Sequence, residues 1–201
     1  MRTKLTTVIL FSGMISFILS CSPKNISTKY YYLHEKALDK AEETYKRLYG
    51  QQPFTIAFTD KDFNTLSLEI ITDTLRYIYR FDINETRLND TLVAYRLNAP
   101  AVIELIRQLQ SMRCTWINKL DYYVDEKKST LILMSIKPVA FNAPFSYKKY
   151  YTIAYFPQPQ YFDSAGQLLD KRKLRRLRKI NGEVFNRIND KVCYTISGNF
   201  R

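Results

Sequence analysis

The sequence predicts a single α+β domain built mainly from antiparallel strands, with about three helices on one face of the sheet. In three segments apolar residues recur every three or four positions, and in most others they alternate with polar residues. The alternating segments come in runs between the helical ones, which is typical of antiparallel α+β proteins and not of doubly wound nucleotide-binding folds. No repeat or low-complexity stretch divides residues 28–201.

The first predicted helix spans residues 28–49, with Ser27 as N-cap and Gly50 as its end. Its apolar residues are spaced by three and four positions and form one stripe, which predicts that the helix packs on the sheet. The stripe consists of Tyr30, Leu33, Ala37, Ala41, Tyr45 and Leu48.

From Phe54 onward the pattern changes to a period of two. Residues 65–70 and 75–81 alternate between apolar and polar side chains, which predicts two half-buried strands. A second helix is predicted at residues 98–113, because Asn98 can cap it and a proline stands in its first turn.

A hairpin follows over residues 120–136, with a polar turn at 125–129. Its return strand is almost continuously apolar, so we expect it to lie at the centre of the sheet. Prolines then confine a further strand to residues 147–156, which carries aromatic side chains on both faces.

The last part of the chain predicts a turn, a helix and a strand. Residues 163–166 have turn composition, Asp170 can cap a third helix that runs to about Asn189, and residues 191–197 alternate as a final strand.

Composition excludes several classes of protein. The chain has 201 residues, of which 46% are hydrophobic and 25% charged, as in globular proteins and not in collagen-like, coiled-coil or disordered chains. Its net charge is +12. Three cysteines and one histidine exclude a disulfide-rich mini-protein and multi-histidine metal chemistry.

The N-terminus has the pattern of an export signal. Arg2 and Lys4 precede an uncharged, largely apolar run that ends in Ile18-Leu19-Ser20-Cys21. This ending resembles the lipobox of bacterial lipoproteins. The resemblance implies that residues 1–20 are a signal peptide cleaved before Cys21, and that Cys21 then carries diacylglycerol and a further acyl chain such as palmitate. Residues 22–27 would be a polar spacer between the lipid and the domain.

The resemblance also implies a location. A protein with several acyl chains is held at a membrane of the cell envelope, with its domain in a compartment such as the periplasm. Some lipoproteins are retained at the inner membrane by an acidic residue after the cysteine; Ser22 is not acidic, so the outer membrane is favoured over the inner. Two alternatives stay open: an ordinary cleaved signal and an uncleaved anchor.

The predicted third helix carries a dense cluster of positive charge. Of the nine residues from 171 to 179, seven are cationic: Lys171, Arg172, Lys173, Arg175, Arg176, Arg178 and Lys179. They indicate either a merely solvated face or a contact with anionic lipid or another envelope protein. Nucleic acid is not expected as a partner, because the chain is predicted to be exported.

Signatures of catalysis are missing from the sequence. It contains no nucleophile elbow, phosphate-binding glycine loop, dinucleotide fingerprint or zinc motif, so no catalytic residue, metal ligand or cofactor is predicted. Residues 60–71 do not complete a calcium loop and are interpreted as a polar turn. Cys114 and Cys193 could form a disulfide in an oxidising compartment or stay as separate buried thiols.

The leading hypothesis is therefore a lipid-anchored envelope protein that serves as a non-catalytic binding or assembly module and carries a basic C-terminal helix. A rival hypothesis is an envelope hydrolase that uses a pair of carboxylates and tyrosine. A cleft with two close carboxylates, one of raised pKa, would favour the hydrolase. A third is a subunit of a larger secretion or surface machine.

Overall fold

The computed structural model describes residues 22–124, 126–139, 148–171, 173 and 175–198. The helices are α2 (Pro23–Tyr49), α3 (Thr86–Ala94) and α4 (Ala99–Ser111). The strands are β1 (Phe54–Phe58), β2 (Thr65–Ile71), β3 (Arg76–Asp82), β4 (Trp116–Val124), β5 (Lys127–Pro138), β6 (Tyr150–Tyr155), β7 (Lys179–Ile180), β8 (Glu183–Val184), β9 (Asn186–Arg187) and β10 (Val192–Ser197).

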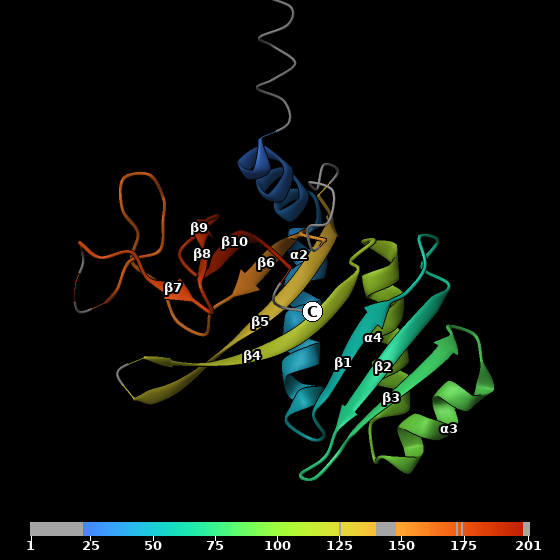
Figure 1. The fold of residues 1–201 in the computed structure, drawn as a ribbon. Coiled ribbons are helices and arrows are strands. Elements are labelled where there is room, and N and C mark those ends of the chain that lie inside the picture. The colour runs from blue at the N-terminus through green and yellow to red at the C-terminus, as the bar shows by residue number, and fades with distance from the viewer. Residues whose placement is uncertain (1–21, 125, 140–147, 172, 174, 199–201) are drawn as a thin grey trace, which may run out of the picture.

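Eight of these strands form one antiparallel sheet in the order β3-β2-β1-β4-β5-β6-β10-β9, and β7 pairs with β8 separately. The helices gather on one side of this sheet, with α2 along its middle and α3 and α4 beside β1 to β3 (Figure 1). The α+β class is thus confirmed.

The main core lies between the helices and the sheet. Leu38, Tyr45 and Leu48 of α2 are fully buried there with the inward residues of β1 and β2. The Tyr45 hydroxyl donates to the Phe54 carbonyl oxygen at 2.6 Å, which fixes the end of α2 against the start of β1. This core is continuous from α4 to β10.

The opposite face of the sheet is covered over only part of its width. A second core joins β4, β5, β6 and β10 to the chain that runs from Phe156 to Phe185. Within the described residues this covering segment is folded largely as turns and short bridges (Figure 1). As a result, β6 is buried on both faces at all six positions.

Most predicted strands are confirmed. β5 lies between β4 and β6, as its apolar composition indicates, and β6 and β10 fall within the ranges expected of them. The polar turn near Asp60 is confirmed as well, because the Asp60 carboxylate accepts hydrogen bonds from the backbone N–H groups of Asn64 and Thr65.

The predicted helix over residues 170–189 is wrong. Where the chain is described there, it forms turns and the strand pairs β7–β8 and β9–β10. Asn181 and Gly182 both have positive φ, 51° and 82°, and form the tight turn between β7 and β8 that an Asn-Gly pair favours. This turn chemistry and the burial of Leu168, Ile180 and Phe185 outweigh the helical spacing of the leucines.

The first helix starts earlier than predicted. Ser22, and not Ser27, is the N-cap, since its hydroxyl accepts from the Asn25 backbone N–H at 3.2 Å. The expected spacer is therefore mostly helix. Leu33 was expected in the core but is 73% exposed, because the buried side of α2 is centred on Tyr31 and Leu38. α3 has no counterpart among the predicted elements.

Candidate functional site

The predicted lipidation site, Cys21, lies outside the described residues. The structure places its neighbour Ser22 beside the β7–β8 hairpin: Ser22, Pro23 and Lys24 line a shallow depression together with Gly182 and Glu183. The start of α2 and the β7–β8 hairpin thus lie at the same end of the domain.

We call residues 171–179 the basic loop; most of its described cations are exposed. Arg172 lies outside the described residues, and Lys171, Lys173, Arg175, Arg176 and Lys179 are exposed. Arg178 is different: its guanidinium lies 5.0 Å from the centre of the Tyr122 ring and donates to Gln160 Oε1 at 3.3 Å. Arg178 therefore holds the loop to the domain, while the other described cations face solvent.

Cys114 and Cys193 are both free and buried, so the suggested disulfide is not formed. The physical reason is the sheet: Cys114 belongs to the core on the helix side and Cys193 to the core on the other side. Burial raises the pKa of the Cys114 thiol to about 12 and that of Cys193 further. Both thiols stay protonated at neutral pH.

One region of the sheet lacks a cover on the side away from the helices, and we call it the open half. No described element packs over it. It is a shallow hollow of about 290 Å³ formed by side chains of β1, β2, β3 and β4 and the residue after β1. The lining residues are Thr55, Ala57, Thr59, Ser67, Glu69, Ile78, Arg80, Trp116 and Asn118.

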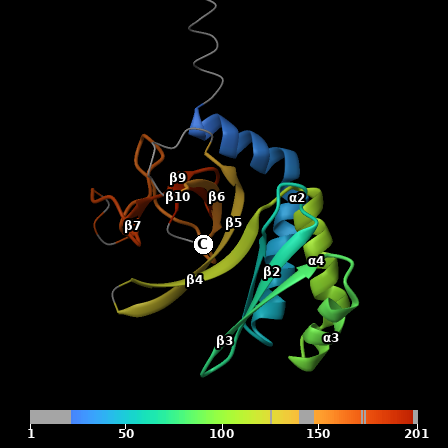
Figure 2. The ribbon, with the colours of Figure 1, turned by 45° about the vertical axis from the view of Figure 1, so that its right-hand side comes forward.

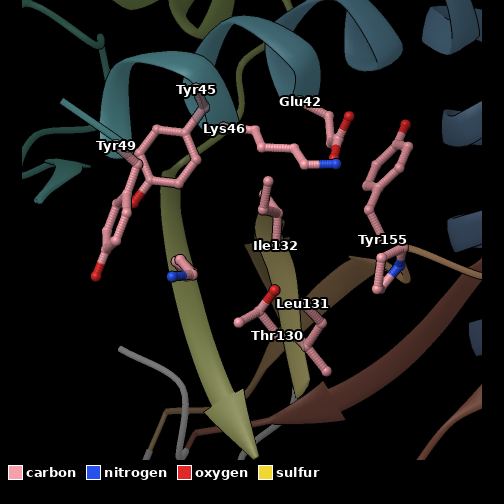
Figure 3. A pocket seen from close by; sticks show the side chains of 11 residues that line it. Glu42, Tyr45, Lys46, Tyr49, Thr130, Leu131, Ile132 and Tyr155 are labelled. Carbon is pink, nitrogen blue, oxygen red and sulfur yellow. The ribbon is translucent and has the colours of Figure 1, made fainter. Parts of the chain in front are cut away.

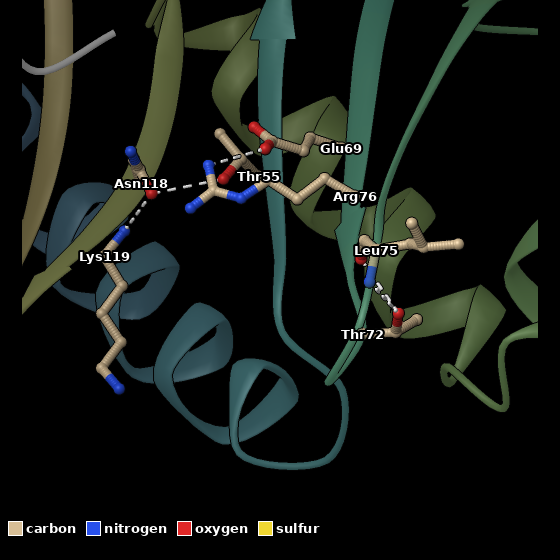
Figure 4. A network of polar contacts seen from close by, with 7 residues as sticks. All are labelled: Thr55, Glu69, Thr72, Leu75, Arg76, Asn118 and Lys119. Carbon is tan, nitrogen blue, oxygen red and sulfur yellow. Dashed lines mark hydrogen bonds and ion pairs between the residues drawn. The ribbon is translucent and has the colours of Figure 1, made fainter.

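Polar side chains cross the open half from strand to strand (Figure 4). Thr55 on β1 donates to Asn118 Oδ1 on β4 at 3.2 Å, and the same oxygen accepts from the backbone N–H of Lys119 at 2.7 Å. On the outer strands the Arg76 guanidinium lies 3.2 Å from Glu69 Oε1. These contacts hold polar groups in place on an otherwise exposed surface.

The inner wall of the open half contains a buried donor. Trp116 is only 2% exposed, yet its indole N–H has no hydrogen-bond partner among the described residues. Ser135 and Thr152, its neighbours across β5 and β6, carry hydroxyls that likewise lack a partner in the described part of the chain. Because an unpaired buried polar group costs about 1–3 kcal/mol, this row is a local loss of stability in the described part of the chain.

A second concave region runs alongside α2 on the helix side of the sheet, and we call it the α2 groove. Figure 3 shows Glu42 and Lys46 extending from α2 over Ile132, with Tyr155 beside them. The pocket has a volume of about 190 Å³. It adjoins a more open depression that also contains Asp39.

The acidic groups of this α2 groove have distinct environments. Burial is the main cause that raises the pKa of Glu42; the charges of Glu43 and Asp39 add to it and that of Lys46 opposes it. Asp39 Oδ1 instead accepts a hydrogen bond from the Tyr155 hydroxyl at 2.9 Å. Burial and the nearby carboxylate raise the pKa of Tyr155, so this hydroxyl stays protonated and acts as a donor.

Within the described ranges, no three His, Cys, Asp or Glu side chains come together as ligands for a metal ion. Over the same ranges, no helix combines the length and apolar character needed to cross a bilayer.

In comparisons with known proteins, no family model matches the chain, and neither does any curated protein or solved structure.

The sequence analysis identified neither the open half nor the α2 groove. A signal for the first was present, because Thr55, Ala57 and Thr59 alternate with Phe54, Ile56 and Phe58 and so predict one polar face on β1. The pairing of β1 with both β2 and β4 is what turns that face into a site, and strand order could not be derived from the local pattern.

Proposed function

We propose that the protein is a lipid-anchored component of the bacterial cell envelope, and that its domain is a non-catalytic binding or assembly module. The open half is the binding surface in this proposal. The basic loop supplies a second, electrostatic contact with anionic lipid or with another envelope protein.

The observation that carries the proposal is the hollow of the open half, over which no described element packs. It is bordered by a guanidinium, a carboxylate, an amide and hydroxyls. At its inner wall the indole N–H of Trp116 has no partner among the described residues. A partner that brings polar groups to this border would gain hydrogen bonds that the domain does not make by itself.

The anchor is tested by cell fractionation with metabolic palmitate labelling. We expect the label on the wild-type chain and none on Cys21→Ala, which should leave the membrane fraction. Separation of inner and outer membranes tests the proposed outer-membrane location. An unlabelled wild-type protein that still carries its N-terminal residues would contradict the anchor.

The binding surface is tested by site-specific photo-crosslinking in cells. A crosslinker at Ile78, which is 68% exposed on the open half, should capture a defined envelope partner, whereas one at Val93 on α3, 61% exposed, should not. Arg80→Ala should reduce the Ile78 adduct. Equal adducts at both positions would count against the open half as the site.

The basic loop is tested by charge removal. Changing Lys173, Arg175 and Arg176 to glutamine should weaken binding of the protein to its partner or to anionic vesicles, and the loss should shrink at high salt. The same changes at Lys61, Lys127 and Lys128 give a matched control. Unchanged binding by the loop variant would remove the loop from the proposal.

The hydrolase remains the alternative, and one observation favours it. The α2 groove contains Glu42, whose pKa is raised, and Asp39, which holds a tyrosine hydroxyl. A carboxyl of raised pKa near a second carboxyl is an arrangement used in general acid catalysis. Hydrolytic activity on an envelope polymer that Glu42→Gln abolishes, without a change in folding, would favour the hydrolase.

A further inference from the structure

The exposed side of α2 near its N-terminus combines apolar and cationic side chains. Tyr32 is 56% exposed and Leu33 is 73% exposed, the highest value among the exposed large hydrophobic residues of the described chain. Lys29 and Lys36 are also exposed. Because an α-helix turns by about 100° per residue, Lys29, Leu33 and Lys36 lie along one line, with Tyr32 next to it.

This stripe points away from the rest of the domain. The residues of α2 that pack into the core, among them Tyr31 and Leu38, lie on the opposite side of the helix. Figure 2 shows the first turns of α2 along the upper margin of the molecule, above the sheet. We call the residues Lys29, Tyr32, Leu33 and Lys36 the α2 stripe.

The stripe is close to the proposed lipid in sequence and in space. Ser22 caps the helix and the residue before it is Cys21, so no flexible spacer separates the two. With a rise of about 1.5 Å per residue, Leu33 lies only about 16 Å along the helix from Ser22. A side chain at that distance from a membrane anchor lies within reach of the lipid headgroups.

We propose that the α2 stripe lies on the bilayer surface, with Tyr32 and Leu33 in the interfacial layer and Lys29 and Lys36 against anionic headgroups. This inference rests on the proposed lipid anchor and adds the orientation in which the anchored domain is held. Tyrosine is suited to the interface because its ring is apolar and its hydroxyl polar. Lysine can bury its carbon chain while the ammonium group stays near phosphate.

The charges around the stripe favour this contact. The first turn of α2 contains no acidic residue, and Lys24 adds a further exposed cation there. Glu35 is exposed but lies toward Tyr31, whose hydroxyl donates to it at 3.4 Å. Further along, Lys40 lies 3.9 Å from Glu104 on α4, so a carboxylate partly balances this cation.

A fluorescent probe can report the depth of the stripe in the full-length lipidated protein. The probe is placed on Leu33→Cys and, as a control, on Val93→Cys of α3, in vesicles of three parts phosphatidylethanolamine and one part phosphatidylglycerol. Labelling is selective because Cys114 and Cys193 are buried thiols of raised pKa. Both probe positions are more than half exposed, so neither change should disturb folding.

We expect a blue-shifted emission and quenching by nitroxide lipids at position 33 and neither at position 93. A probe at position 33 that reports water would overturn the proposal, as would equal quenching at both positions. In addition, Lys29→Gln and Lys36→Gln should each lower the docked-to-undocked ratio about fivefold, since a lysine near an anionic surface is worth about 1 kcal/mol. Lys61→Gln and Lys127→Gln should leave the ratio unchanged.

The palmitate label tests the anchor, and the probe at position 33 tests the docked orientation, so the two can fail separately. If palmitate labels the wild type and Cys21→Ala releases it, yet position 33 stays in water, the anchor holds and the docked orientation is wrong. If no label is found and the protein is not membrane-bound, the proposed function fails first.

Discussion

Strands β3 and β6 each contain three aromatic residues, but β3 also carries three charged residues and β6 none, and their surroundings differ. β3 reads Arg-Tyr-Ile-Tyr-Arg-Phe-Asp and β6 reads Tyr-Tyr-Thr-Ile-Ala-Tyr. Every residue of β6 is buried, whereas only Phe81 of β3 is. The difference arises because the segment from Phe156 to Phe185 covers the β4, β5, β6 and β10 part of the sheet and not the open half. Alternation of side chains thus reports which residues share a face, and a distant segment decides whether that face is covered.

The largest expected effect comes from removing the cover. Phe185 is fully buried between the covering segment and the sheet, so Phe185→Ala should lower the free energy of unfolding by about 3–5 kcal/mol. Ile78→Ala, at an exposed position of the open half, should change it by less than about 0.5 kcal/mol. Chemical denaturation of both variants checks this. Equal losses would show that the two parts of the sheet are protected alike.

Two threonines allow the covered part of the sheet and the open half to be compared by the loss of a single hydrogen bond in each. Thr195 on β10 is buried and donates to the Val184 carbonyl oxygen at 2.9 Å, so Thr195→Val should cost about 1–3 kcal/mol by leaving that oxygen unpaired. Thr55→Val in the open half should cost less than about 1 kcal/mol, because Asn118 keeps its bond to Lys119 and access to water. Thermal melting of the pair distinguishes these outcomes. A larger loss for Thr55→Val would contradict the assignment of the open half as solvated.

The α2 groove gives a pH-dependent prediction. Burial raises the pKa of Glu42 above its ordinary value of 4.5, so the folded protein binds this proton more tightly than the unfolded chain does. Stability contributed by this group is therefore complete below the unfolded pKa and decreases as the pH rises through the folded one. Glu42→Gln should remove that decrease and make the variant relatively more stable from about pH 5 upward. The Tm of the wild type and of Glu42→Gln is measured between pH 3 and 8. A difference in Tm that stays constant over this range would contradict the prediction.

The smallest expected effect is that of a reductant. Since Cys114 and Cys193 lie in cores on opposite sides of the sheet, dithiothreitol should not change the Tm of the domain. Thiol titration of the domain should find both groups only after denaturation. A lower Tm in reductant would indicate a bridge and hence a different arrangement of β10.

The sequence predicted most elements that have a strong period, and it missed α3 and the β7–β8 hairpin. Asn98 caps α4 through a bond to the Ala101 N–H, and Gly50 ends α2, both as expected. Over residues 170–189, leucines at helical spacing predicted a helix, but Asn181 and Gly182 set a hairpin turn within that range. Positive φ at two adjacent residues is incompatible with a continuing helix.

The candidate site could be predicted only in part. The lipobox-like ending at Cys21 is local and can be read from adjacent residues. The row of Trp116, Ser135 and Thr152 depends on strands paired over long sequence distances. Each of these residues is unremarkable in its own segment, and their relation exists only in the register of β4, β5 and β6.

The Ser22 cap also has a mechanical consequence. α2 contains 27 residues and is therefore a rod about 40 Å long, whose buried side lies in the main core from Tyr31 to Leu48. If Cys21 is acylated as proposed, only Ser22 separates this rod from the lipid. Thermal undulation of a membrane, or a pull by a bound partner, would then act as a torque on the whole sheet.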